Sequence, residues 1–192
     1  NDFYWWDQNN TLEILKLMQN TSKEIRVRGL NAFGDIEPIT IDLNDEKYAK
    51  YFPIKNFDGK LVAGWTANGE RDTSLIEQQK IVFEYPSSSA ISQKSVFKEF
   101  GSHTNISDVY IEIQNNEGDL SFNGAFLVQN EIIGATFSNV TFDIKKSVKI
   151  NAINGKAGFI TPSAQNSNFA GIKFIIGNSK TITFNENTDN DV

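Results

Sequence analysis

The sequence contains no cysteine and a single histidine, His103. The absence of cysteine excludes disulfide bonds and thiolate metal sites. One imidazole cannot supply the two histidines of an H-E-x-x-H zinc site, and the chain has no G-x-S-x-G motif and no phosphate-binding glycine loop. We therefore expect no catalytic constellation, no metal site and no cofactor, and we interpret His103, in "GSHTN", as an exposed turn residue.

Positive charge is in the minority, with 18 Lys and Arg residues against 24 Asp and Glu residues and a net charge of −6. Nucleic acid is therefore not an expected partner, because phosphate binding requires a concentrated basic surface. Two small basic clusters, at Arg26 with Arg28 and at Lys145 with Lys146 and Lys149, are interpreted as solvated faces.

Long apolar runs are also missing, so we expect no membrane-spanning segment. The chain begins "NDFYWW", without methionine and without a signal peptide. We interpret it as the processed product of an exported protein or a piece of a longer one, with an extracellular or bacterial cell-surface location.

What the chain does have is phenylalanine, 15 residues in 192, against one methionine. Phenylalanine favours strands, whereas a helical bundle would rely on Leu, Met and Ala. The length suits one domain with a sizeable core. The composition therefore favours a single all-β domain.

Residues 1–50 are expected to form an N-terminal cap. Its helix is predicted over 10–19, with Asn10 as the N-cap and Glu13 at the capping-box spacing. The predicted buried stripe of that helix is Leu12, Ile14, Leu15 and Met18. The alternating runs "EIRVRG" and "PITIDL" then predict strands.

Residues 51–94 are predicted to form the first, irregular rungs of a repeating structure. Turn signals occur in "FDGK" and "ANGE", and "KIVFEY" is a further strand candidate. No regular spacing is visible in this part of the chain.

Residues 95–186 contain three repeats of about 31 residues. Each repeat begins with a short segment of small and apolar residues and continues with a long run of alternating apolar and polar residues. It ends with a shorter alternating run, which we call the echo. The aligned apolar positions of the long runs are Ile106, Val109, Ile111 and Ile113; Phe137, Val140, Phe142 and Ile144; and Phe169, Ile172, Phe174 and Ile176. The echoes are "LSFN", "VKIN" and "ITFN".

Repeats of this length, made only of short strands, indicate the rungs of a stack. We therefore predict an all-β, right-handed parallel β-helix with an N-terminal capping helix. Three hairpins packed as a β-sandwich are the second interpretation. Residues 187–192 form a polar tail, and we expect either a longer protein or a final rung that stays exposed.

The repeats resemble those of GLUG-motif proteins, whose units read roughly "GGLVGYN" and then "GTISNVTV". The closest stretch is "GAFLVQNEIIGATFSNVTFDI", and "ITIDLND" with "FPIKNFDGKL" also resembles the segments that precede such repeats. The resemblance implies a right-handed β-helix on a bacterial exported or surface-attached protein. Such modules occur in adhesins and in the non-catalytic N-terminal region of metallopeptidases that cleave immunoglobulin A.

The repeat alignment places Glu112 beside Asp143 on the outer face, with Tyr110 in the neighbouring column. These three residues are the binding candidates, since two stacked carboxylates can shift a pKa or hold calcium. The alternative is a pair of solvated acids. The segment "FYWW", Phe3 to Trp6, is either a platform for sugar rings or part of the packing on the first rung.

Three functions follow from these expectations. The first is a non-catalytic, monomeric surface module that binds a host or environmental glycan or protein. The second is a non-catalytic spacer or substrate-docking domain of a large surface metallopeptidase. The third is a polysaccharide-cleaving β-helix enzyme that uses outer-wall carboxylates.

Overall fold

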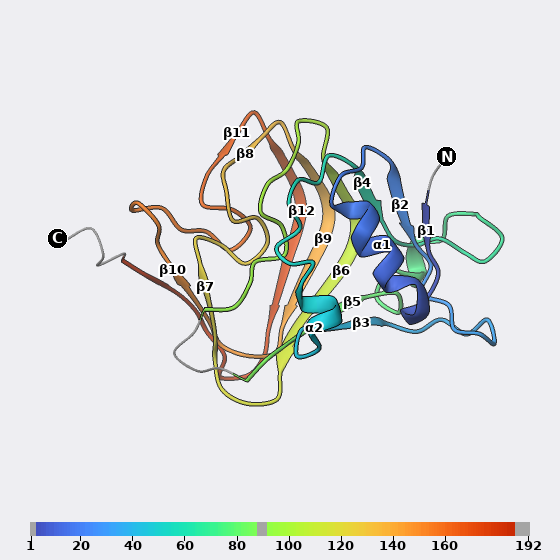
Figure 1. Cartoon of the computed structure of the whole chain (residues 1–192), viewed down its shortest axis with the longest axis horizontal. Coiled ribbons are helices and arrows are strands. Elements are labelled where there is room, and N and C mark those ends of the chain that lie inside the picture. The colour runs from blue at the N-terminus through green and yellow to red at the C-terminus, as the bar shows by residue number, and fades with distance from the viewer. Residues whose placement is uncertain (1–2, 88–91, 187–192) are drawn as a thin grey trace.

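The computed structural model describes residues 3–87 and 92–186 and shows a β-solenoid of about five turns with a short helix at its N-terminus (Figure 1). The elements are β1 (Phe3–Trp5), η1 (Gln8–Asn10), α1 (Thr11–Met18), β2 (Glu24–Val27), β3 (Ile39–Asp42), α2 (Glu46–Ala49), β4 (Lys60–Val62), η2 (Thr73–Leu75), β5 (Ile81–Tyr85), β6 (Asn105–Asn115), β7 (Leu120–Asn123), β8 (Ile132–Ile133), β9 (Thr136–Ile144), β10 (Val148–Asn151), β11 (Ala164–Gln165), β12 (Asn168–Ile176) and β13 (Ile182–Asn185).

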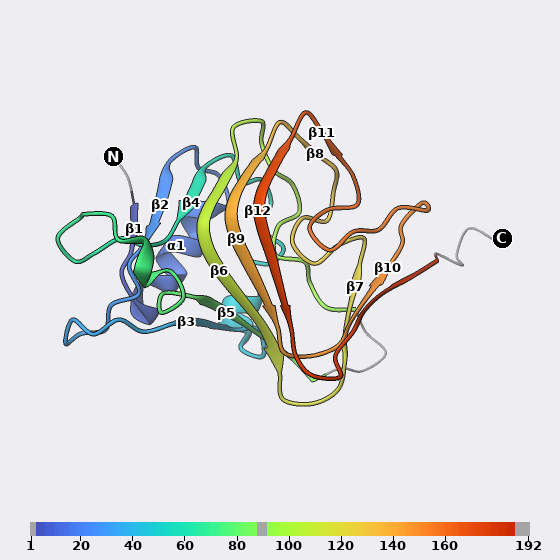
Figure 2. The same ribbon diagram turned by 180° about the vertical axis from the view of Figure 1, so that it is seen from behind.

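One broad sheet forms a wall of the solenoid, and β6, β9 and β12 lie side by side across it (Figure 2). All pairings between the described strands are parallel, in this sheet and in the smaller sheets β7–β10–β13 and β8–β11. The predicted solenoid is therefore confirmed. A sandwich of hairpins would need antiparallel neighbours, so that alternative is wrong.

The three repeats stack in the predicted register. Ile106 pairs with Phe137 and then Phe169, and Val109 pairs with Val140 and then Ile172. Like side chains lie above like because the inward residues of each rung must be covered by those of the next. The side chain of Val140 is completely buried by this arrangement.

Each long strand of the wall bends at a residue with a left-handed backbone. The bends lie at Asp108 (φ 52°), Asn139 (φ 53°) and Gly171 (φ 64°). Asp, Asn and Gly are the residue types that adopt this conformation most readily. In the first two turns a loop interrupts the wall near the same place. The loop 28–38 separates β2 from β3, and the loop 63–80 separates β4 from β5. Each of these pairs of short strands takes the position of one long strand.

The helix α1 follows Asn10 as predicted, but the 3-10 turn η1 precedes it and takes the capping box. Asp7 and Asn10 form the capping box around η1, and the side chain of Asn10 does not cap α1, so the predicted box with Glu13 is wrong. The buried face of α1 consists of Thr11, Ile14, Leu15 and Met18. Thr11 takes the place predicted for Leu12 because its hydroxyl accepts a hydrogen bond from the buried Trp5 indole at 3.1 Å.

The last described rung leaves its apolar residues uncovered. The exposed ones are Phe169, Phe174, Ile176 and Phe184. Their equivalents one rung earlier are fully buried, for example Phe137 and Phe142. An exposed final rung was one of the two predicted alternatives, the other being a longer protein. The predicted tail 187–192 lies outside the described residues.

Candidate functional site

The outer face of the broad sheet brings together the three residues predicted as binding candidates. Glu112 on β6 pairs with Asp143 on β9, and Tyr110 pairs with Thr141. Their outward direction follows from strand alternation, since Ile111 and Ile113 on either side of Glu112 point into the core. The predicted stacking of the two carboxylates is therefore confirmed.

The two carboxylates are buried, not solvated. Only 7% of Glu112 and 3% of Asp143 is exposed. The Lys80 ammonium lies 2.9 Å from Glu112 Oε1, and the Lys145 ammonium lies 3.2 Å from Asp143 Oδ2. Buried carboxylates are stable only when paired or hydrogen-bonded, and here each has its own lysine.

Tyr110 completes this group, which we call the carboxylate seam (Lys80, Tyr110, Glu112, Asp143 and Lys145). Its hydroxyl donates a hydrogen bond of 2.6 Å to Asp143 Oδ2. Burial, this bond and the nearby negative charges raise the pKa of Tyr110 well above its ordinary value. Asp143 Oδ1 is enclosed and accepts no hydrogen bond from a described residue. The contacts of this carboxylate with Tyr110 and Lys145 are both made by Oδ2.

A metal role for the seam gains no support from the geometry. No group of three or more His, Asp or Glu side chains in residues 3–87 and 92–186 is arranged to hold a metal ion. The lysines occupy the positions where calcium ligands would be needed.

A second group lies on the same outer face, at the N-terminal end of the sheet. We call it the aromatic–arginine face; it consists of Tyr4, Trp6, Arg26, Arg28 and Trp65. Tyr4 pairs with Arg26 across β1 and β2, and their neighbours Phe3 and Trp5 point inward beside Ile25 and Val27. The segment "FYWW" therefore divides, with Trp5 in the core and Tyr4 and Trp6 outside.

The arginines of this face stack on its rings. The Arg28 guanidinium lies 3.8 Å from the centre of the Tyr4 ring and 4.0 Å from that of Trp6. The Arg26 guanidinium lies 4.0 Å from the centre of the Trp65 ring. Cations are attracted to aromatic faces at such distances. Rings and guanidinium groups therefore alternate along the face, and each of the five side chains packs against a neighbour.

Arg28 is the unusual member of the face. It is only 4% exposed, yet its guanidinium forms no hydrogen bond or ion pair with any residue in the described part of the chain, and its Nε is fully enclosed. The predicted solvated position is therefore wrong for Arg28. A buried cation is costly, and among the described residues the rings of Tyr4 and Trp6 offset part of that cost.

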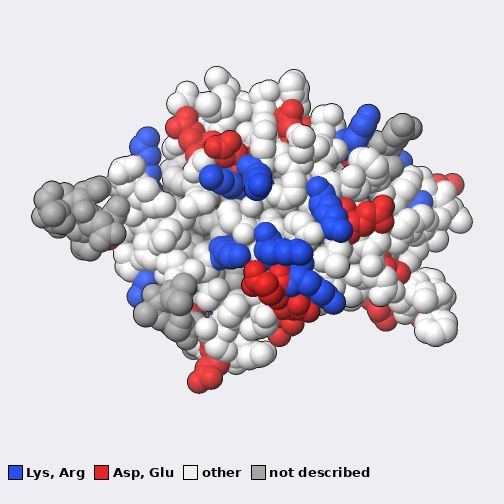
Figure 3. Space-filling model, in the orientation of Figure 1, with Lys and Arg blue, Asp and Glu red and all other residues white. Residues whose placement is uncertain are grey.

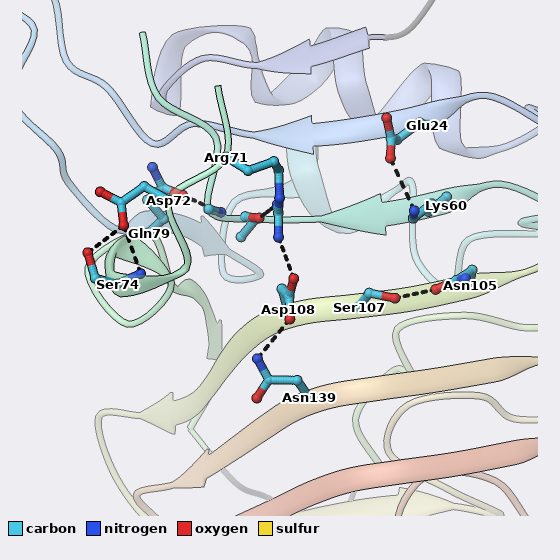
Figure 4. Close-up of polar contacts among 12 residues, drawn as sticks. Glu24, Lys60, Arg71, Asp72, Ser74, Gln79, Asn105, Ser107, Asp108 and Asn139 are labelled. Carbon is cyan, nitrogen blue, oxygen red and sulfur yellow. Dashed lines mark hydrogen bonds and ion pairs between the residues drawn. The ribbon is translucent and has the colours of Figure 1, made fainter. Parts of the chain in front are cut away.

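A polar chain continues from this face across the sheet (Figure 4). Arg71, 5.3 Å from the centre of the Trp65 ring, forms an ion pair with Asp108. Asp108 also accepts a 2.8 Å hydrogen bond from Asn139. Both acceptor and donor sit at the left-handed bends, so the bends bring polar groups of successive rungs together.

Sequence reasoning missed the aromatic–arginine face because its parts are far apart in the chain. Trp65 and Arg71 belong to the loop 63–80, which showed no regular pattern. The available signal was the period-two spacing of Tyr4 with Trp6 and of Arg26 with Arg28, which places all four on one face of neighbouring strands. His103 is where it was predicted, in a turn with an 81% exposed side chain.

The comparisons with known proteins add nothing to this geometry. No family model matches the chain, and neither curated proteins nor solved structures gave a match. None of the described helices is long and apolar enough to cross a membrane.

Proposed function

We propose that this chain is a non-catalytic binding module of a bacterial surface or secreted protein, and that it binds a glycan through its aromatic–arginine face. The observation that carries the proposal is the stacking of Trp6, a residue that is 45% exposed, on the Arg28 guanidinium, which forms no hydrogen bond or ion pair within residues 3–87 and 92–186. An aromatic ring offers an apolar surface to the face of a sugar ring. A guanidinium offers several donors to hydroxyl or carboxylate oxygens.

The rigidity of the face supports a binding role. Tyr4 is held from two sides, since its ring contacts Arg28 and its hydroxyl accepts a 2.8 Å hydrogen bond from Arg26. Side chains fixed before the ligand arrives lose little entropy on binding. A protein ligand is the alternative partner, because arginine and tryptophan are also common in protein interfaces.

The ion pairs in the carboxylate seam favour a binding role for the protein over a catalytic one. A polysaccharide-cleaving enzyme needs one carboxyl group to donate a proton and another to act as base or nucleophile. Here the Glu112 and Asp143 carboxylates are each in contact with a lysine ammonium. The surface location and the monomeric state belong to the same proposal. The surface location is supported by the resemblance of the repeats to those of GLUG-motif proteins.

A role as a spacer or docking domain of a larger surface peptidase is the second candidate. The uncovered final rung favours it, because Phe169, Phe174 and Phe184 are exposed where earlier rungs are covered. Exposed strand edges and apolar residues are normally covered in stable proteins. Further rungs or another domain would cover this surface.

Replacing Trp6 by Ala is expected to weaken glycan binding on the order of tenfold, because the stacking surface is lost. A glycan array would identify the ligand, and calorimetry with that ligand would measure the change. Phe33→Ala is the matched control, since Phe33 is 90% exposed and lies outside the face. Equal effects of the two substitutions, or a protein array that alone yields a ligand, would refute glycan binding at this face.

Incubation with neutral and acidic polysaccharides is expected to release no new reducing ends. The enzyme hypothesis makes the opposite prediction, with turnover that Glu112→Gln or Asp143→Asn abolishes. Measurable turnover of that kind would contradict the proposed non-catalytic role.

A further inference from the structure

A pocket of ≈ 570 Å³ is lined by residues at the ends of α1 and α2. These two helices lie on the opposite side of the molecule from β6, β9 and β12 (Figures 1 and 2). The pocket lies where the end of α1, the end of α2 and the segments around Lys55 and Lys98 meet. Its size is within the range of small-ligand sites. Figure 3 looks onto the helix side and shows basic and acidic side chains next to one another around the centre of the view, with uncharged surface between them.

Three lysines line the pocket, Lys50, Lys55 and Lys98, and no acidic residue does. None of the three forms an ion pair with a residue of the described segments. This local positive charge stands out in a chain of net charge −6. Lys50 follows the last residue of α2, where a cation suits the helix end, but Lys55 and Lys98 are not at a helix end.

Hydrogen bonds fix the walls of this lysine pocket. The side-chain amide of Gln19 donates to the carbonyl oxygens of Leu15 at 3.1 Å and Tyr51 at 3.0 Å. Its oxygen accepts from the backbone N–H of Lys55 at 3.2 Å. The backbone N–H of Lys98 donates to Ile54 at 2.7 Å. The lysines therefore project from anchored backbone around a preformed hollow.

The remaining lining residues besides Gln19 are Tyr51, Phe52 and Pro53, which we call the apolar strip, and Phe52 is buried. A pocket lined both by ammonium groups and by an apolar strip suits a ring that carries negative groups at its edge. A small inorganic anion would contact the lysine ammonium groups but would leave the apolar strip uncovered.

We propose that the lysine pocket binds an acidic saccharide, one whose carboxylate or sulfate groups meet the lysines while a sugar ring covers the apolar strip. This site is separate from the aromatic–arginine face and does not depend on the function proposed for that face. The ammonium groups act as point charges, so binding weakens as salt rises.

The test is calorimetric titration at low salt with tetragalacturonate and with a sulfated tetrasaccharide. Changing Lys50, Lys55 and Lys98 together to Gln is expected to weaken binding on the order of 10- to 100-fold, about 2- to 5-fold for each exposed charge. The matched control changes Lys23, Lys149 and Lys156 to Gln, which removes the same charge from exposed positions outside the pocket. Circular dichroism checks that both variants are folded.

Retained affinity in the pocket variant, or an equal loss in the control, would overturn the proposal. Equal binding of the fully methyl-esterified tetragalacturonate would overturn it too, since that probe has no charge. Binding of inorganic sulfate or of a phosphopeptide, with neither saccharide bound, would assign the pocket to another ligand class. Trp6→Ala should leave binding at the pocket unchanged, so failure of one proposed site is distinguishable from failure of the other.

Discussion

Replacing Phe126 by Ala is expected to lower the free energy of unfolding by about 3–5 kcal/mol, the usual cost of removing a buried phenylalanine. Phe126 is 0% exposed. Its ring centre lies 5.2 Å from those of Phe122 and Phe159, and 6.1 Å from that of Phe83. The substitution therefore opens a cavity that several rungs share. Urea denaturation followed by circular dichroism measures the change.

Phe33→Ala is the control for this prediction. The chemical change is the same, but Phe33 is 90% exposed, so its effect is expected to stay within about 0.5 kcal/mol. Similar losses in the two variants would mean that Phe126 is not in a continuous core. The difference in the free energy of unfolding between the two variants therefore tests whether successive rungs share one core.

The repeats were readable from the sequence because burial imposes the same demand on each rung. Val109, Val140 and Ile172 keep their residue class since each covers the next. One alternating strand fixes which residues face inward, and the recurrence fixes which strand lies beside it. That information is local and repeated, so the register could be predicted to the residue.

The first turns of the solenoid could not be predicted in the same way. The loops 28–38 and 63–80 interrupt the wall and destroy the constant spacing. Strand β1 pairs with β2, with Phe3 beside Ile25, but no sequence repeat indicates this pairing. Asn10 does hold the predicted N-cap position of α1, but its capping hydrogen bond was predicted wrongly, because its side chain bonds instead to the backbone of Tyr4 and Trp6.

The positions of the two carboxylates in the candidate site could be predicted from the repeat, but their surroundings could not. Register placed Glu112 beside Asp143, but their burial depends on Lys80, at the end of an irregular loop, and on Lys145, beyond the end of β9. Likewise, Arg28 is buried against Tyr4 of β1 and against Trp6, which directly follows β1. Side-chain environment comes from neighbours in space, and a single sequence does not contain those contacts explicitly.

Raising the pH above 10 is expected to destabilise the protein steeply. Burial raises the pKa of Tyr85 well above its ordinary value of 10.0. The pKa of Tyr110 is also raised, by burial and by its hydrogen bond to Asp143. Below pH 10 both tyrosines carry their proton in the folded and the unfolded states, so their contribution to stability is constant.

Above pH 10 the unfolded chain loses these protons while the folded chain keeps them, so stability falls with rising pH. Each tyrosine contributes a slope of about 1.4 kcal/mol per pH unit until its folded pKa is reached, and the two together give about twice that slope. Urea denaturation at a series of alkaline pH values measures the slope. The ultraviolet absorbance of the phenolate reports the ionisation directly.

Two variants separate the contributions of the tyrosines. Tyr110→Phe and Tyr85→Phe should each reduce the alkaline slope by about half, although each also removes a hydrogen bond, worth about 1 kcal/mol at neutral pH, to Asp143 or to the carbonyl of Lys94. The slope isolates the protonation effect from that constant loss. If both hydroxyls ionise in the folded protein at the same pH as in the unfolded chain, neither is held as the buried donor that the structure shows, and the carboxylate seam would have to be open to solvent.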